Sequence, residues 1–144
     1  MPPSVGGSCK MYRQWAGRRR MQLDECPPPK GVGPTLLKVG GFGAFRTLEN
    51  EAGLHILEDA DVEDGRRIVV RVRTAAGPWQ EPKSAEAYRE FTRLLSQGND
   101  SNVIVRRYRS GASPLVRDFR GAWRSGRLEA VLGGDFDLIG ALAR

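Results

Sequence analysis

The fold is decided by the stretch Gly43-Ala44-Phe45-Arg46-Thr47-Leu48-Glu49-Asn50-Glu51-Ala52-Gly53-Leu54-His55. Just before it, a strand at 35–39 and a strand at 42–45 are predicted to join through the turn pair Gly40-Gly41. Residues 47–53 predict a short helix that ends at glycine, a favoured residue just past a helix C-terminus. Residues 55–57 predict another short strand. Strands interrupted by short helices are typical of the α+β class.

The N-terminal part of the chain predicts one helix and one strand before this stretch. Residues 9–19 place Met11, Tyr12 and Trp15 along one side of a helix. Residues 21–26 predict a strand. Residues 27–34 contain four prolines and two glycines and predict a loop, because proline cannot donate to a sheet.

The C-terminal part predicts two further strands and two helices. In the strand at 67–73, Val70 and Val72 alternate with Arg71 and Arg73, which predicts one buried face and one basic face. Residues 85–95 predict an amphipathic helix, for which Ser84 is a suitable N-cap. A strand at 102–108 and a terminal helix at 137–144 complete the prediction. The expected fold is α+β, with a mainly antiparallel sheet and short helices packed on it.

Composition predicts a single globular domain over residues 1–144. The chain is 40% hydrophobic and 28% charged, which is ordinary for a globular protein. No apolar run reaches the roughly 18 residues of a spanning helix, and the first residues lack the apolar region of a signal peptide. Cys9 and Cys26 are too few for a disulfide framework, so we expect two reduced thiols in a cytoplasmic protein.

Arginine dominates the charge of the chain and indicates an RNA partner. The formal net charge is +6 and the isoelectric point is about 9.9. Guanidinium groups bind phosphate oxygens bidentately and stack on bases, which suits RNA. The alternative is an arginine-rich surface that is only solvated. The candidate RNA-binding residues are Arg66, Arg67, Arg71, Arg73, Arg106 and Arg117.

Several motifs, taken together, resemble one protein family. The opening stretch is similar to the segment Y/F-G-x-L-R-T-E-x-G-V-H of the bacterial class-I peptide chain release factors, most like the type that reads UGA. Residues 11–16 resemble the M-Y-x-R-W-A helix of that family, 65–67 its G-R-R, 105–108 its I-R-S-Y, and 130–137 its A-V-L-D-G-x-L-D. The shared order implies a central body at 8–79 and a C-terminal piece at 103–144. A helical segment at 80–102 stands where the family has a further domain.

The departures from the family pattern bear on function. The G-G-Q tripeptide, which in the family enters the peptidyl-transferase centre, occurs nowhere in the sequence, and the codon-reading S-P-F is also absent. Ile68 stands where the family has a codon-contacting His, and the N-terminal helical domain has no counterpart. The resemblance therefore implies a release-factor-like protein of translational termination that binds ribosome or RNA. We expect no enzymatic peptide release, no stop-codon reading and no cofactor.

Other signals for catalysis or ligand binding are weak. His55 is the single histidine, and the family carries a His at that place, so a structural role is expected. Residues 41–46 lack the third glycine of a dinucleotide loop. The acidic loop at 58–64 has Asp64 where a calcium loop requires glycine, and two cysteines with one distant histidine cannot form a zinc site.

Two questions stay open at the level of sequence. The acidic loop would be repelled by messenger RNA, so it either faces a basic protein partner or has no partner. The function could also be that of a protein-interaction or RNA-stabilising module that keeps the release-factor fold but no longer acts on the ribosome. A decayed gene fragment without a selected role is a third possibility.

Overall fold

The computed structural model describes residues 5–60, 65–97 and 101–142. The first helix, α1, spans Val5–Arg18, and its residues Met11, Tyr12, Trp15 and Ala16 are buried. Their spacing places them on one helical face, as the sequence predicts for the first three. The helix begins four residues earlier than the predicted start at residue 9.

A two-stranded antiparallel sheet follows α1. It consists of β1 (Gln22–Cys26) and β2 (Leu36–Gly40), and its register pairs Gln22 with Gly40 and Cys26 with Leu36. A single 3-10 turn, η1 (Pro29–Gly31), lies in the proline-rich connection. Both predicted strands are therefore present within one residue of their expected bounds.

The prediction of a strand at 42–45 is wrong. The chain turns at Gly43, whose φ of 77° is left-handed, and enters the helix α2 (Ala44–Leu48). Phe42 in this turn is fully exposed, so no sheet buries it. The 3-10 turn η2 (Glu49–Glu51) continues α2 up to the next strand. The predicted helix at 47–53 is thus shifted toward the N-terminus by about three residues.

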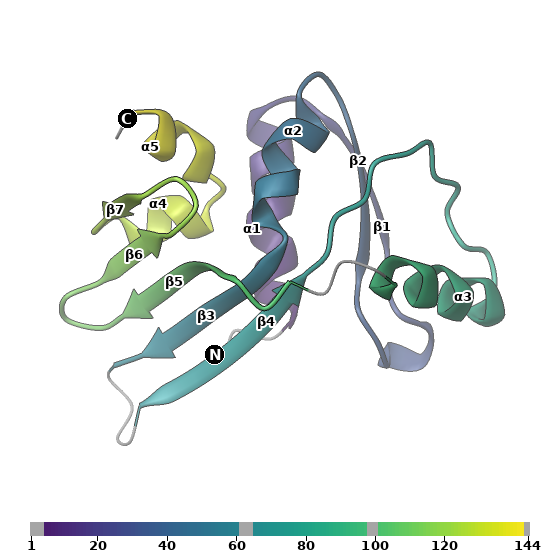
Figure 1. Ribbon diagram of the computed structural model, residues 1–144, viewed down its shortest axis with the longest axis horizontal. Coiled ribbons are helices and arrows are strands. Elements are labelled where there is room, and N and C mark those ends of the chain that lie inside the picture. The colour runs from purple at the N-terminus through teal and green to yellow at the C-terminus, as the bar shows by residue number, and fades with distance from the viewer. Residues whose placement is uncertain (1–4, 61–64, 98–100, 143–144) are drawn as a thin grey trace.

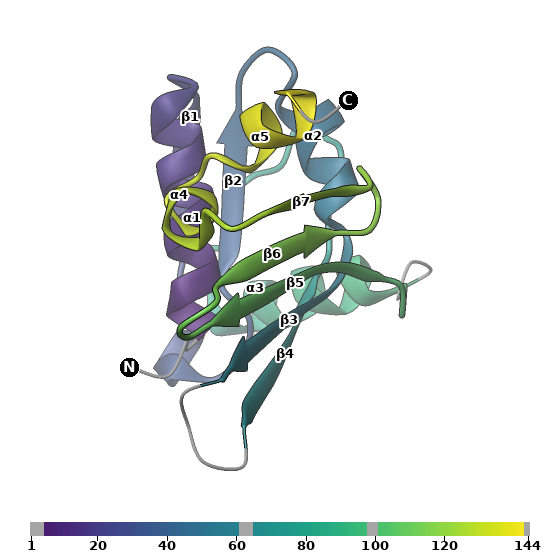
Figure 2. The same ribbon diagram turned by 90° about the vertical axis from the view of Figure 1, so that its left-hand side faces the viewer.

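The main sheet has five strands in the order β4-β3-β5-β6-β7, seen side by side in Figure 2. The strands are β3 (Gly53–Asp59), β4 (Arg66–Val72), β5 (Ile104–Ser110), β6 (Leu115–Asp118) and β7 (Trp123–Ser125). The β3–β5 pair is parallel, and the other three pairs are antiparallel. A mainly antiparallel sheet with short helices confirms the predicted α+β class.

Helices cover one face of this sheet. The core joins Tyr12 and Trp15 of α1 to Tyr108, Val116 and Trp123 of the sheet. It also includes residues of α4 (Leu128–Leu132) and α5 (Phe136–Leu142), namely Leu128, Val131 and Phe136. Half-buried residues of β1 and β2, including Leu23 and Val39, pack against the same core. The hydrophobic side chains of α1, α4 and α5 therefore lie on the same side of the main sheet.

The helix α3 (Ala85–Ser96) occupies the segment predicted to be helical. Ser84 is the N-cap, and its Oγ accepts a hydrogen bond of 3.0 Å from the Ala87 amide, as predicted. Tyr88 is buried, and its hydroxyl donates to the Pro34 carbonyl in the loop before β2. In Figure 1, α3 lies at the end of the molecule away from β6 and β7. Among the described residues, no helix combines the length and the apolar character needed to cross a bilayer.

Candidate functional site

Two of the candidate RNA-binding arginines lie on one face of the β3–β4 ladder. Arg67 is opposite Glu58, and Arg71 is opposite Leu54. Because side chains alternate along a strand, Arg67 and Arg71 share a face that Val70 does not. Arg71 also donates to the Ser101 carbonyl at 2.7 Å and to Asn102 Oδ1 at 2.8 Å. The predicted basic face of this strand is thus present at these two positions, while RNA contact itself stays a prediction.

The neighbouring candidates Arg66 and Arg73 lie at the two ends of β4. Arg66 has the parity of Val70 and is opposite Asp59 at the end of the hairpin. Arg73 follows the last residue of β4, so strand alternation no longer determines its direction. It lines an open groove of about 660 Å³. The structure therefore places Arg67 and Arg71 on one face of β4, and a place for Arg73 on that face stays a prediction.

Arg117 extends the basic face across the sheet. It is exposed in β6, and its guanidinium lies 4.9 Å from the centre of the Phe119 ring. The residues opposite Arg117 are Arg107 on β5 and Arg124 on β7. Arg107, Arg109 and Arg124 are not among the residues predicted from the sequence. The alternation of Arg107 and Arg109 in the sequence is the one signal that could have indicated them.

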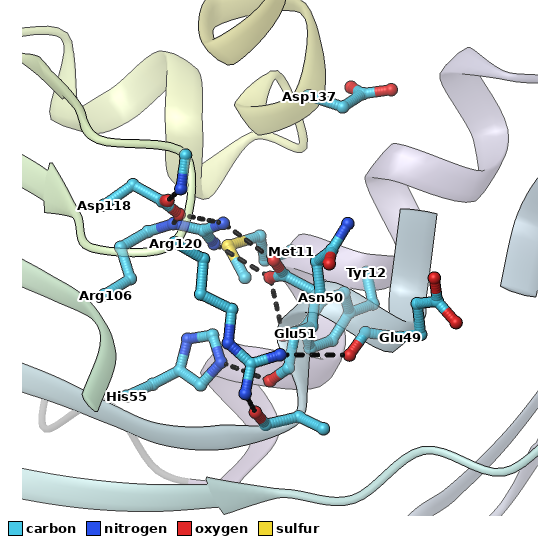
Figure 3. Close-up of polar contacts among 12 residues, drawn as sticks. Met11, Tyr12, Glu49, Asn50, Glu51, His55, Arg106, Asp118, Arg120 and Asp137 are labelled. Atoms are coloured by element: carbon cyan, nitrogen blue, oxygen red, sulfur yellow. Dashed lines mark hydrogen bonds and ion pairs between the residues drawn. The ribbon is translucent and has the colours of Figure 1, made fainter. Parts of the chain in front are cut away.

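The assignment of Arg106 to RNA binding is corrected by the structure. Its side chain is only 3% exposed, on the face of the sheet that α1 covers. The guanidinium donates to Glu51 at 2.7 and 2.8 Å and to Asp118 at 2.9 Å (Figure 3). A charge paired with two buried carboxylates inside the core cannot reach a nucleic acid. Arg106 is a structural residue that links β5 to β6 and to η2.

A hydrogen-bond network surrounds this buried ion cluster. Tyr12 on α1 donates to Glu51 Oε1 at 3.0 Å, and Arg106 also donates to the Tyr108 hydroxyl at 2.9 Å. The pKa values of Tyr12 and Tyr108 are raised by burial, so both phenols stay protonated at neutral pH. The network satisfies the polar groups that the ion cluster brings into the core.

His55 belongs to the same network and has a structural role. Its Nε2 lies 2.8 Å from the Glu51 carbonyl, and its Nδ1 lies 3.0 Å from the Tyr108 hydroxyl. A carbonyl can only accept, so Nε2 carries the proton and Nδ1 accepts from Tyr108. Both ring nitrogens are therefore engaged, and the ring is only 2% exposed. Burial lowers the pKa of His55, which keeps the imidazole neutral. Neither nitrogen is free to act as an acid or base.

The neutral state of His55 makes stability depend on pH. Its pKa in the folded protein is lower than the 6.5 expected in the unfolded chain, so the unfolded state binds the proton first as pH falls. We expect the free energy of unfolding to decrease as pH falls below about 6.5, by up to about 1.4 kcal/mol per pH unit for one proton. Denaturant titrations at pH 7.5 and pH 5.5 measure this.

The matched variant is His55→Gln, which keeps a donor for the Glu51 carbonyl but does not titrate. Since His55 is the single histidine, the variant should lose the part of the pH dependence that lies between these two values. The interpretation fails if wild type and variant lose equal stability between pH 7.5 and pH 5.5.

The acidic loop predicted at 58–64 is partly a strand. Glu58 and Asp59 are the last residues of β3, and Glu58 accepts from Arg107 at 2.9 Å. Ser110 donates to Asp59 at 3.2 Å. The remaining acidic positions, at 61–64, lie outside the described residues. Among residues that the structure describes, no group of three acidic, histidine or cysteine side chains could hold a metal ion.

Comparison with known structures gives the chain a release-factor-like fold. One similar structure is RF2 of Thermus thermophilus, with a TM-score of 0.56 and 20% sequence identity. The match covers 94% of this chain and 61% of that chain, so this chain spans less than two thirds of the length of RF2. No protein-family model matches the sequence, and no curated protein matches it. At this identity the likeness establishes the fold alone.

Proposed function

We propose that the chain is a cytoplasmic, release-factor-like protein of translational termination that binds the ribosome or RNA. The observation that supports this best is the match to RF2 over 94% of the chain, in the presence of an exposed arginine-rich sheet face. The sequence motifs resemble the UGA-reading type of release factor, and we propose that the chain is related to that type. Binding, rather than chemistry, is the proposed activity.

We propose that the chain does not hydrolyse peptidyl-tRNA, and two observations support this. No G-G-Q tripeptide occurs in the sequence, and the segment between Trp79 and Val103 contains α3 in its described part. His55 is buried with both nitrogens hydrogen-bonded. The single histidine is therefore not available for general acid–base catalysis.

We propose that the chain does not read stop codons, and the position of Ile68 supports this. This residue is half-buried in β4 and is opposite Leu57, which packs against the core. An aliphatic side chain cannot stack on a base as an imidazole does. The S-P-F tripeptide is missing as well. We therefore propose that any ribosome contact is independent of the codon in the decoding centre.

Two linked measurements test this proposal. Ribosomes that carry peptidyl-tRNA at a UGA codon should release peptide only at the background rate when the purified chain is added. Its affinity for ribosomes programmed with UGA, UAA or a sense codon should agree within error. Peptide release well above background, or a tenfold codon preference of about 1.4 kcal/mol, contradicts the proposal. An intact class-I release factor serves as the positive control in both assays.

A protein-interaction module is the second candidate, and one observation favours it. The groove beside α3 is lined in part by Phe45, Trp79 and Leu94, which are 44%, 37% and 50% exposed. Exposed apolar side chains around a groove are typical of protein-binding surfaces. Salt dependence separates the two candidates, because phosphate contacts weaken steeply with salt and apolar contacts do not. Ribosome binding that persists unchanged between 50 and 500 mM salt, about a threefold change in Debye length, favours the module.

A further inference from the structure

Three arginines stand directly opposite one another across neighbouring strands. Arg107 on β5 is opposite Arg117 on β6, and Arg117 is opposite Arg124 on β7. Neighbouring strands are about 4.8 Å apart, so the three Cα atoms lie within about 10 Å. Like charges at directly opposite positions repel each other and destabilise a sheet. The row of arginines therefore destabilises the isolated protein unless a negatively charged group lies beside it.

The protein supplies little counter-charge to this row. Glu58 pairs with Arg107 at 2.9 Å, and both side chains are more than one third exposed. Within the part of the chain that the structure describes, Arg109, Arg117 and Arg124 have no ion pair with a carboxylate. Arg117 is held against the Phe119 ring, which orients its guanidinium without neutralising it.

Further arginines continue the row over the same sheet face. Arg67 and Arg109 are on either side of Glu58 in the next register row. Arg71 follows on β4. We name this surface the arginine face, and its members are Arg67, Arg71, Arg107, Arg109, Arg117 and Arg124. The register places one carboxylate, that of Glu58, among these six charges.

Four members of the arginine face, Arg67, Arg109, Arg117 and Arg124, are exposed because the core helices pack against the other side of the sheet. The core residues of β5 and β6, Tyr108 and Val116, have the opposite parity to Arg107 and Arg117. The helices α1, α4 and α5 contribute to that core and therefore cover the other face. Figure 2 shows α1 along one side of the stack of strands. Val69, which shares the parity of Arg67, is 52% exposed.

We infer that the arginine face binds the phosphate backbone of RNA. The inference rests on the proposed function and names the surface that carries it. Planar guanidinium groups donate two parallel hydrogen bonds to phosphate oxygens, and several of them on one open sheet suit a repeating polyanion. A phosphate backbone across the row neutralises the repulsion among its members. Contact through the backbone requires no particular base sequence.

The test compares two triple variants of equal charge. The face variant is Arg109→Gln, Arg117→Gln and Arg124→Gln, which leaves the Arg107–Glu58 ion pair in place. The control variant is Arg20→Gln, Arg46→Gln and Arg89→Gln, at exposed positions outside the main sheet. Both remove three positive charges. A third variant with lysine at the three face positions keeps the charge but loses the bidentate geometry.

Binding is measured against a 20-base-pair RNA duplex and against intact ribosomes, each over a range of salt concentrations. The face variant should bind the duplex at least tenfold more weakly than wild type, with the slope of log affinity against log salt reduced by about two to three. The control variant should stay within about threefold of wild type. The lysine variant should keep the salt slope and lose affinity. The melting temperature of the face variant should not fall, because like-charge repulsion is removed.

The outcomes separate this inference from the proposed function. Equal losses in the face and control variants mean that binding follows net charge alone, which overturns the inference. Ribosome binding by wild type that the face variant retains in full also overturns it and leaves the proposed function standing. Duplex binding that depends on the face, without ribosome binding, supports the inference and contradicts the proposed role in translational termination on the ribosome. Displacement of the duplex by polyglutamate of equal charge indicates an acidic protein partner and overturns the choice of RNA.

Discussion

Replacing Arg106 with Gln should lower the free energy of unfolding by about 3–5 kcal/mol, a large share of the stability of a single domain. Glutamine cannot supply the positive charge that Glu51 and Asp118 share, and these carboxylates are only 4% and 5% exposed. Two uncompensated negative charges would then remain in the core. The guanidinium also lies 5.0 Å from the centre of the Phe136 ring, a contact that glutamine lacks.

The matched control is Arg107→Gln, one residue farther along the same strand. Arg107 forms an ion pair with Glu58 on the open face, and its side chain is 37% exposed. Such a pair contributes about 0–1 kcal/mol, so this variant should unfold close to wild type. Urea titrations at pH 7.5 compare the two. A loss below about 1 kcal/mol in Arg106→Gln would falsify the interpretation that the buried charge holds the core together.

Gly134→Ala should also destabilise the fold strongly. Gly134 has a φ of 95°, which L-residues with a side chain rarely adopt. A Cβ at this position would lie 2.4 Å from the Trp15 amide nitrogen and 2.8 Å from the Trp15 Cα. The backbone of α1 would have to move away from the turn after α4. We expect a loss of about 2–5 kcal/mol from backbone strain and overpacking together.

Gly17→Ala is the control for this second prediction. Gly17 is exposed in α1, and a Cβ added there would meet open space, with no neighbouring side chain within 4 Å. Alanine favours the helix over glycine, so the variant should gain up to about 1 kcal/mol. Thermal melts of both variants measure these changes in stability. If Gly134→Ala and wild type have the same melting temperature, α1 does not approach this turn as closely as described.

The elements predicted from the sequence are those with strong local signals. The helix at 85–96 has a Ser84 cap and an amphipathic stripe, and β4 has clear alternation of valine and arginine. The strands β6 and β7 span only four and three residues, and the sequence does not predict them. Elements this short are stabilised by their neighbours in the sheet rather than by their own residues.

The candidate site could be predicted only in part, because it depends on contacts between distant segments. Arg106 and Arg107 are adjacent and chemically identical, yet one is buried and the other half-exposed. The choice depends on Glu51 and Asp118, which lie 55 and 12 residues away in the sequence. Alternation indicates that neighbours face opposite sides but not which side is covered.

The arginine face also depends on contacts between segments that are distant in the sequence. Its central row forms because the registers of two separate strand pairs bring Arg107, Arg117 and Arg124 to the same level. A shift of one residue in either pair would place an arginine on the core face instead. The sequence alone therefore indicates a basic protein, and the fold concentrates that charge on one surface.

Co-sedimentation of the wild-type chain with intact ribosomes tests the central claim most directly. We expect the chain to pellet with ribosomes in a saturable manner at 50 mM salt and to be released progressively toward 200 mM, as several phosphate contacts require. A folded chain that stays in the supernatant at every salt concentration would contradict the account.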